Sequence, residues 1–346
     1  MKVALKELAV PGKSALKLSD VSESGKYPVY GASGLVGYRD DYQCESSSVA
    51  IIKDGAGVGR VSLLPAFSSV LGTMQLLRPI EGVDVGYLSY AVKSLRLGKS
   101  FVGSTIPHIY FKNYGKSLIE KRDIFSQRKI SSVLHEVEEG IEMLDSRITM
   151  LDSLVKSRFI EMFPDWDLSL QRPEWKPLGE VSDIYTGTTP STSDSANWEG
   201  GTIPWVTPAE LSDTDYIVED TERHITEKGR VSKSLTLMPK GTVLLSTRAP
   251  IGKVAITGVQ MTCNQGFKNF GCHKELNPTY LYSLLKMNKE WLQSQGTGTT
   301  FKEISKSKAE KIRVFVPEKE EQDKFESFYR LLDKPGFDQR IQHRDS

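Results

Sequence analysis

Residues 124–162 read IFSQRKISSVLHEVEEGIEMLDSRITMLDSLVKSRFIEM, and this stretch decides how the rest of the chain is organised. It contains no proline and one glycine. Its apolar residues recur at alternating spacings of four and three, namely Ile130, Leu134, Val137, Ile141, Leu144, Ile148, Leu151 and Val155. A repeat of about 3.5 residues is typical of the seam of a coiled coil. The sequence therefore predicts a helix roughly 58 Å long, which needs a partner helix to cover its apolar stripe.

The regions before and after this helix repeat one another. Val49-Ala-Ile-Ile matches Val243-Leu-Leu-Ser, Gly59-Arg-Val-Ser-Leu matches Gly252-Lys-Val-Ala-Ile, and Gln127-Arg-Lys matches Gln322-Asp-Lys. The offset between the copies stays between 193 and 195 residues. A long unit that occurs twice is not a solenoid of small repeats. It predicts two similar folded modules, each followed by a helix.

The predicted fold class is α+β, with two similar mixed α/β modules separated by long antiparallel coiled-coil helices. Short β-like runs broken by glycine and serine predict strands at 49–52, 61–64, 242–246 and 254–257, and helices are expected at 85–97 and 278–292. The second spacer helix keeps the phase of the first through Phe325, Phe328 and Leu332. The expected boundaries are 1–118 for the first module, 119–163 for the central helix, 164–177 for a proline-bounded linker, 178–317 for the second module and 318–346 for the short second helix and tail.

The composition is that of an ordinary globular protein. The chain has 346 residues, of which 38% are hydrophobic and 26% charged. It lacks an apolar run of the roughly 18 residues that a membrane span needs, and its first residues do not resemble a signal peptide. Three scattered cysteines do not form a disulfide framework. We therefore expect a cytoplasmic protein.

The charge is unevenly distributed although the net charge is only +1. Residues 1–117 carry 14 basic and 9 acidic side chains. Residues 164–227 carry 3 basic and 14 acidic side chains, whereas residues 228–317 carry 15 basic and 4 acidic ones. The basic regions suit contact with a polyanion, and an unevenly charged solvated surface is the alternative.

Two cation-bearing turns follow equivalent strands. Lys53-Asp-Gly-Ala-Gly-Val-Gly59-Arg60 has the spacing G-x-G-x-G, and a strand follows it, so a hairpin fits better than a dinucleotide loop. Its copy is Thr247-Arg248-Ala-Pro-Ile-Gly252-Lys253. A purely structural hairpin and contact with nucleic acid remain open for both turns.

The remaining motifs of the sequence do not predict a catalytic site. Asn277-Pro-Thr-Tyr280 is similar to the adenine-binding loop of amino-methyltransferases, but the repeat has Asp84-Val-Gly-Tyr87 there, which favours a helix start. Neither H-E-x-x-H nor C-x-x-C occurs, and His273 beside Cys272 is too little for a metal site.

Small hydroxyl residues precede cations near the end of each module. The two stretches are Gly103-Ser-Thr-Ile-Pro-His-Ile-Tyr-Phe-Lys112 and Gly296-Thr-Gly-Thr-Thr-Phe-Lys302-Glu-Ile-Ser-Lys306. Such residues suit phosphate contact, with plain loops as the alternative. Arginine, asparagine and glutamine nearby have side chains able to read base edges. The candidate DNA-binding residues are Lys53, Arg60, Gln75, Arg78, Ser104, Thr105, Lys112, Arg248, Lys253, Asn264, Gln265, Thr299, Thr300, Lys302 and Lys306.

The chain as a whole resembles the DNA-specificity subunit of Type I restriction-modification systems. The resemblance rests on the order module, long helix, module, helix. Its sequence marks are Tyr27-Pro-Val-Tyr-Gly-Ala-Ser-Gly34, Ile203-Pro-Trp-Val-Thr-Pro208, Leu244-Leu-Ser-Thr-Arg-Ala-Pro-Ile-Gly-Lys253, Thr297-Gly-Thr-Thr300 and the Glu-Glu-Gln-Asp-Lys324 opening of the last helix.

The resemblance implies a non-catalytic subunit in which two target-recognition domains each read one half of a split, asymmetric DNA sequence. The helices would fix the spacing and hold modification subunits with adenine methyltransferase activity, and a motor-nuclease subunit would join them. S-adenosylmethionine, ATP and Mg²⁺ would bind to those partners. The final helix is shorter than the central one, and Ile119-Glu-Lys-Arg-Asp lacks the proline that stands at Pro317. A self-contained DNA adenine methyltransferase and a coiled-coil assembly adaptor without a DNA role are the alternatives.

Overall fold

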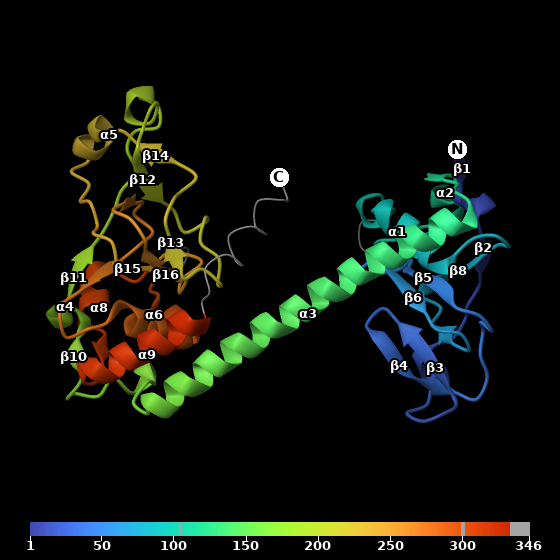
Figure 1. Ribbon diagram of the computed structural model, residues 1–346, viewed down its shortest axis with the longest axis horizontal. Coiled ribbons are helices and arrows are strands. Elements are labelled where there is room, and N and C mark those ends of the chain that lie inside the picture. The colour runs from blue at the N-terminus through green and yellow to red at the C-terminus, as the bar shows by residue number, and fades with distance from the viewer. Residues whose placement is uncertain (104–105, 299–301, 333–346) are drawn as a thin grey trace. The chain divides into compact units, whose positions relative to one another are not determined.

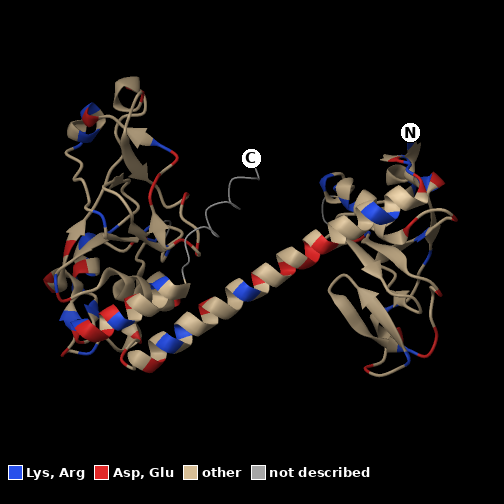
Figure 2. Cartoon of the chain, viewed as in Figure 1, with Lys and Arg blue, Asp and Glu red and all other residues tan. Residues whose placement is uncertain are grey.

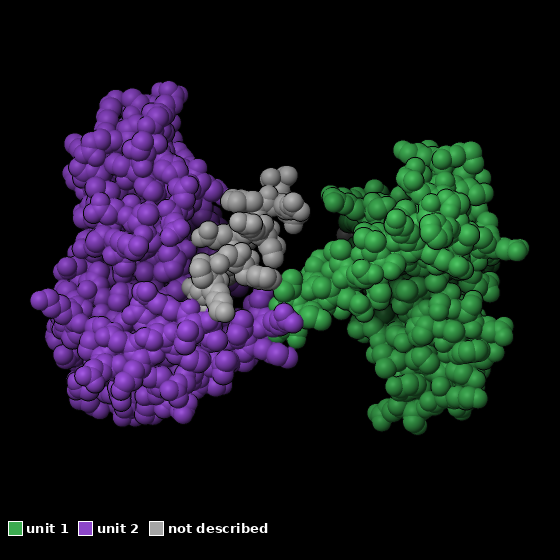
Figure 3. All heavy atoms as spheres, viewed as in Figure 1, with its two compact units in different colours: residues 1–146 green, residues 147–346 purple. Residues whose placement is uncertain are grey.

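The structure, a computed structural model, describes residues 1–103, 106–298 and 302–332. The chain divides into two compact units, Met1–Ser146 and Arg147–Ser346, which Figure 3 shows in different colours. Both units mix helices and strands, as the sequence predicts (Figure 1). The boundary lies inside the long helix α3 (Ile124–Met162), so each unit holds one module and one part of this helix.

The described residues of unit 1 form three small sheets. An antiparallel sheet has the spatial order β2 (Ala9–Gly12), β8 (Met74–Pro79), β5 (Ser48–Ile52) and β6 (Val61–Leu64). A second has the order β4 (Gly34–Arg39), β3 (Tyr27–Gly31) and β7 (Ser69–Val70), with β3 and β7 parallel. The third pairs β1 (Lys2–Ala4) with β9 (Leu118–Glu120). The helices α1 (Val85–Ser94) and α2 (Phe111–Tyr114) complete the module.

Unit 2 repeats this arrangement. Its main sheet has the order β11 (Ser182–Tyr185), β18 (Asn269–Cys272), β15 (Val243–Leu245), β16 (Val254–Thr257) and β13 (Ile217–Val218). The second has the order β14 (His224–Ile225), β12 (Ile203–Val206) and β17 (Thr262–Cys263), again with one parallel pair. The third pairs β10 (Lys176–Pro177) with β19 (Arg313–Val314). Its helices are α4 (Leu178–Val181), α5 (Glu227–Ser232), α6 (Pro278–Met287), α7 (Lys289–Gln295), α8 (Lys306–Lys311) and α9 (Lys319–Leu332).

The internal repeat of the sequence is therefore a repeat of topology. Strands β2, β8, β5 and β6 occupy the same order as β11, β18, β15 and β16. The predicted strands at 49–52 and 61–64 correspond to β5 and β6. The second predicted helix is divided, because α6 ends at Met287 and α7 begins at Lys289. Two modules with one fold are what the nearly constant offset predicts.

A buried glutamine holds each spacer helix to its module in the same way. The side-chain oxygen of Gln127 accepts a hydrogen bond from the Asp84 amide at 2.8 Å, and that of Gln322 accepts one from the Asn277 amide at 2.8 Å. The side-chain nitrogen of each glutamine donates to two backbone carbonyls, those of Gly82 and Arg122 in unit 1 and of Glu275 and Pro317 in unit 2. The start of each helix is thus tied to the start of α1 or α6.

The part of α3 within unit 1 packs against α1. Glu138 accepts hydrogen bonds from Lys93 at 2.6 Å and from Tyr90 at 2.8 Å. A Cβ atom at Gly86 would lie 2.0 Å from the hydroxyl of Ser131, so glycine allows the two helices to approach closely. Ile130 packs against the apolar core of the unit. This first end of α3 is therefore held mainly by polar groups.

The last turns of α3 lie in the core of unit 2. Phe159 and Phe163 are fully buried, and their rings contact Tyr280 of α6 with centroids 5.5 and 4.8 Å away. Phe325 of α9 contacts the same two rings, with centroids 5.1 and 5.7 Å away. Val155 and Phe328 are partly buried against this core. The second end of α3 is therefore held by an aromatic cluster.

The predicted helix pair is formed by the described residues only at this second end of α3. α9 has 14 described residues and packs mainly against α6. Phe325 lies in the unit 2 core and Phe328 and Tyr329 pack against it, whereas Leu331 is 72% exposed. Along the middle of α3, Val137 and Ile141 are 53% and 55% exposed, and the predicted seam residues Leu134, Ile148 and Leu151 are also exposed. The tail after Leu332, including Pro335-Gly336, lies outside the described residues.

The segment 164–177, predicted as a linker, is part of the unit 2 core instead. Leu168 and Trp175 are buried, and the Leu168 amide donates a hydrogen bond to the side chain of Asn288 at 2.9 Å. The prolines do mark turns, but burial of the Leu168 and Trp175 side chains in the unit 2 core holds the segment against that core. Among the residues that the structure describes, no helix combines the length and apolar character that crossing a bilayer requires.

Candidate nucleic-acid interface

In unit 1, the turn between β5 and β6 lies against the loop that precedes α2. The Gly55 amide donates to the Pro107 carbonyl at 3.0 Å, and the Ile109 amide donates to the Lys53 carbonyl at 2.9 Å. The loop is closed on itself, because Val102 and His108 exchange backbone hydrogen bonds of 2.9 and 2.8 Å. The cation-bearing turn and the loop are therefore one connected surface, which we name loop cluster 1 (53–60, 97–103 and 106–112).

The equivalent segments of unit 2 are connected in the same way. The Ile304 amide donates to the Thr247 carbonyl at 3.0 Å, which repeats the contact between Ile109 and Lys53. Thr297 and Glu303 exchange two backbone hydrogen bonds of 3.0 Å each, which repeats the closure of the first loop. We name this surface loop cluster 2 (247–253, 264–268, 296–298 and 302–306).

The paired side chains differ in charge between the two clusters. In loop cluster 1 the carboxylate of Asp54 lies 2.7 Å from Nδ1 of His108. In loop cluster 2 a cation, Arg248, stands in the position of Asp54 and pairs with Glu303 at 2.9 Å. Lys268, whose side chain is almost buried, also lies 3.2 Å from Glu303.

The charge on Glu303 is favoured by its two cations. Partial burial alone would raise the pKa of this carboxyl group, but hydrogen bonds from Arg248 and Lys268 outweigh that effect and leave the pKa below its ordinary value. Glu303 is therefore ionised at neutral pH. Two cations around one carboxylate leave loop cluster 2 with a local excess of positive charge.

Several predicted DNA-binding side chains are exposed on these surfaces. Arg60, Lys112, Arg248 and Lys302 are exposed in the two loop clusters, and Arg78 is exposed on β8. Lys112 lies over the ring of Tyr110, with its ammonium 5.4 Å from the ring centroid. Within the described ranges, Lys53, Arg60, Arg78 and Lys302 make no ion pair. These cations suit contact with a polyanion, and their role stays a prediction.

Other predicted residues are used to hold the fold. The ammonium of Lys253 donates to the carbonyls of Pro208 and Leu211, so it anchors a loop instead of standing free on a hairpin tip. The amide of Gln75 donates to the Gly12 and Leu76 carbonyls. The side-chain oxygen of Asn264 accepts a hydrogen bond from the Gly266 amide. Backbone carbonyls near Lys253 and Gln75 and a backbone amide near Asn264, which the sequence pattern does not reveal, account for the difference.

Two further predicted residues lie at the edge of loop cluster 2. Gln265 is exposed and accepts a hydrogen bond from the Thr189 hydroxyl at 2.8 Å. Lys306 begins α8 and lies 3.8 Å from Glu310. The candidates Ser104, Thr105, Thr299 and Thr300 lie outside the described residues.

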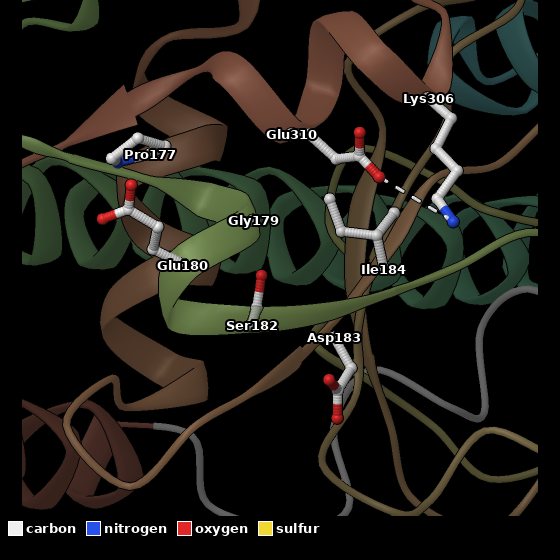
Figure 4. A pocket seen from close by; sticks show the side chains of 8 residues that line it. All are labelled: Pro177, Gly179, Glu180, Ser182, Asp183, Ile184, Lys306 and Glu310. Carbon is white, nitrogen blue, oxygen red and sulfur yellow. Dashed lines mark ion pairs between the residues drawn. The ribbon is translucent and has the colours of Figure 1, made fainter.

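Lys306 also borders a hollow of about 400 Å³ between α4, β11 and α8 (Figure 4). Three carboxylates line it, those of Glu180, Asp183 and Glu310, with Lys306 as the one cation among its lining residues. Gly179 lets α4 approach Glu310 closely. An acidic hollow repels phosphate, so it does not extend the candidate interface.

Sequence reasoning missed two features of the clusters. Lys268 is the counterpart of Gln75 at the same offset of 193 residues, and comparing the two copies residue by residue would have found it. The second feature is the set of exposed apolar side chains in loop cluster 1, such as Phe101 and Tyr110. The sequence pattern that predicted DNA contact consisted of cations, amides and hydroxyl residues, so it did not include them. Among the described residues, no group of histidine, cysteine and acidic side chains is arranged to hold a metal ion.

The fold and the two clusters together define a class of protein: two related modules joined through one helix, each presenting a closed loop cluster that bears cations. The sequence matches the family described as the Type I restriction modification DNA specificity domain over residues 1–150 and 173–334. The chain belongs to this family.

Named relatives agree with this assignment. The chain is 37% identical over 185 residues to the specificity subunit of the Type I restriction enzyme MjaIX from Methanocaldococcus jannaschii, a match that covers 52% of this chain and 43% of that protein. It is 31% identical over 167 residues to the specificity subunit of EcoR124I/EcoR124II from Escherichia coli, covering 46% of this chain and 40% of that protein. The matches thus span less than half of these relatives.

A solved structure shares the fold over nearly the whole chain. It is a crystal structure of the S subunit of a Type I restriction-modification system from M. genitalium. The TM-score is 0.67 at 18% sequence identity, and the alignment covers 96% of this chain and 89% of that one. The predicted two-module α+β fold is confirmed.

Proposed function

We propose that this chain is the specificity subunit of a Type I restriction-modification complex and that each module binds one half of a bipartite, asymmetric DNA target. The observation that carries the proposal is one closed loop cluster built twice on the same sheets with different chemistry. Identical clusters would favour a palindromic target, whereas unlike ones read two unrelated half-sites. The family assignment supports DNA as the ligand.

The chain itself acts without catalysing the reaction. Its cations position the duplex by phosphate contacts, and its loops read bases. Modification subunits supply adenine methylation with S-adenosylmethionine, and a motor-nuclease subunit uses ATP and Mg²⁺. The complex works on DNA in the cytoplasm. Helix α3 sets the spacing between half-sites, and its exposed apolar stripe, centred on Val137 and Ile141, is where modification subunits dock.

The proposal is tested by producing the chain together with its modification subunits in cells and mapping methylated adenines. We expect one motif made of two different half-sites separated by a fixed spacer. Purified complex should bind a duplex carrying that motif with an affinity that falls steeply as salt is raised. If methylation is lost when the modification subunits are omitted, and the chain alone binds no S-adenosylmethionine, the chain is not a self-contained methyltransferase. A complex that binds no duplex at any salt concentration would support a plain assembly adaptor.

A further inference from the structure

Loop cluster 1 exposes large apolar side chains that the rest of the module leaves uncovered. Phe101, Val102, Ile106 and Tyr110 are 50%, 56%, 53% and 48% exposed. All four lie within ten residues of sequence, in the closed loop or directly beside it. Gathered apolar surface of this kind favours a binding partner, because water covers it poorly.

The backbone beneath these side chains is held in place. Hydrogen bonds between Val102 and His108 close the loop, and the contact between Gly55 and Pro107 ties it to the neighbouring turn. That turn lies directly on the segment before Phe101, since a Cβ atom at Gly59 would come within 2.1 Å of the Gly98 amide nitrogen. The apolar side chains are therefore presented by three mutually supported segments.

Cations surround this apolar surface. Lys99 and Lys112 are exposed on either side of it in sequence, and Arg60 is exposed on the adjoining turn. The ammonium of Lys112 already lies over Tyr110. Apolar and aromatic side chains bordered by cations are the pattern with which proteins contact DNA bases while holding the phosphates. Lysine is depleted at protein–protein interfaces, so the two lysines beside this surface favour DNA as the partner.

A hollow of about 280 Å³ opens beside two of these side chains, those of Val102 and Tyr110. Leu97, Val102, Ile109 and Tyr110 supply apolar wall, and Ser100, Asn113 and Ser117 add polar groups. These three polar side chains form no hydrogen bond with any residue inside the described ranges. Free donors and acceptors next to an apolar wall match a base, which has an apolar face and a polar edge.

The equivalent position of unit 2 has different chemistry. Gly296 stands where Phe101 stands in the first module, Thr297 replaces Val102, and Ser305 replaces Tyr110 at an offset of 195 residues. Small and hydroxyl-bearing residues with Arg248 and Lys302 nearby suit phosphate and polar contacts. At three of the four positions the apolar side chain is therefore specific to the first module, and the fourth, Ile106, corresponds to Phe301, which lies outside the described residues.

We infer that Phe101, Val102, Ile106 and Tyr110 contact bases of the first half-site through apolar surface, whereas loop cluster 2 engages its half-site through cations and polar groups. This inference rests on the proposed function and specifies how the first half-site is read. The contact is made either to thymine methyl groups or to the faces of bases at an opened step, and both use the same apolar chemistry.

The test uses the complex with its modification subunits and duplexes that carry the mapped motif or a scrambled first half. Phe101→Ala and Ile106→Ala should each weaken binding to the intact motif roughly tenfold, and leave binding to the scrambled duplex and the salt dependence unchanged. Leu35→Ala is the matched control, because Leu35 of β4 is also 50% exposed in the same unit, and it should bind as the unchanged chain does. Lys112→Gln should instead lower the salt slope by about one.

Two duplex modifications separate the forms of apolar contact. Replacing thymine by deoxyuracil in the first half weakens binding if methyl groups are touched, and 2-aminopurine placed there brightens if a base step opens. If Phe101→Ala and Ile106→Ala leave binding to the intact motif and to the scrambled duplex unchanged, the inference is overturned while the proposed function stands. Loss of the modification subunit from these variants would overturn it in favour of a protein interface. No salt-dependent binding by the unchanged complex would overturn the proposed function as well.

Discussion

The two loop clusters differ far more than the sheets that carry them. Both modules close their loops with the same backbone hydrogen bonds, and both tie their spacer helix down with one buried glutamine. Yet Asp54 and His108 form the pair in one cluster, and Arg248 with Glu303 forms it in the other. Three of the four exposed apolar residues of loop cluster 1 also have small or hydroxyl-bearing counterparts in loop cluster 2, namely Gly296, Thr297 and Ser305. Backbone geometry is shared, whereas the side chains that face a ligand are not.

This difference shows how one fold serves two binding tasks. Buried positions are constrained by packing, because a change of even one methylene group in a close-packed core alters the stability of the fold. Exposed loop positions carry little packing energy, so they tolerate changes of charge and polarity. A duplicated module therefore keeps its core while its two ligand-facing surfaces become different.

The largest expected effect comes from the aromatic cluster at the second end of α3. Phe159→Ala removes a fully buried ring in contact with Phe163, Tyr280 and Phe325. We expect it to lower the free energy of unfolding of unit 2 by about 3–5 kcal/mol. Urea unfolding followed by tryptophan fluorescence measures this. Leu154→Ala is the control on the same helix within unit 2, since Leu154 is 48% exposed, and an equal loss there would contradict the account.

The buried glutamines should behave as a matched pair. Gln322→Ala leaves the Asn277 amide and two carbonyls without their partner, and Gln127→Ala does the same in unit 1. Each change should cost about 2–3 kcal/mol, because buried polar groups lose their hydrogen bonds. Hydrogen exchange with mass spectrometry should show faster exchange in the altered unit alone. Faster exchange in both units would mean that they do not fold independently.

The ion pairs of loop cluster 2 give a smaller effect that depends on pH. Glu303→Gln leaves the nearly buried Lys268 without its carboxylate and should destabilise unit 2 by about 1–2 kcal/mol at pH 7. Because the folded pKa of Glu303 is below its ordinary value, its stabilisation is present above the unfolded pKa and is lost as the pH falls through the folded pKa. Thermal unfolding of both proteins between neutral and acidic pH should therefore converge at low pH. Glu310→Gln, in a looser pair, serves as the control.

The smallest effect on stability belongs to the exposed stripe of α3. Val137→Ser and Ile141→Ser should change the free energy of unfolding by less than about 0.5 kcal/mol, since both side chains are more than half exposed. If modification subunits dock there, the same changes should weaken their capture in size-exclusion chromatography. Full capture by the doubly altered chain would place the docking surface elsewhere.

Periodicity and repetition made most of the fold predictable from the sequence. The spacing from Ile130 to Val155 predicts α3, and the constant offset predicts that β5 and β6 recur as β15 and β16. The role of segment 164–177 was not predictable by the same reasoning. Leu168 and Trp175 are too few to show a period, so prolines dominated the interpretation, whereas long-range packing against the unit 2 core decides the structure.

The contacts between the candidate segments were partly predictable from the sequence, whereas their role in DNA binding stays a prediction. The turns 53–60 and 247–253 each form a backbone hydrogen bond with the later loop of their own module. Lys253 nevertheless bonds to the Pro208 and Leu211 carbonyls, because a distant loop passes within reach of its ammonium. A cation on a turn has the same sequence signal whether it faces solvent or a carbonyl. Contacts between residues far apart in sequence separate the two cases.

The central claim, that two unlike modules read two half-sites, is tested most directly by exchanging the first module. The chain with residues 1–118 replaced by the equivalent module of a relative is produced with its modification subunits, and methylated adenines are mapped. We predict that one half of the motif changes, while the other half and the spacer length stay as in the unchanged chain. A motif that changes in both halves, or in neither, would contradict the account.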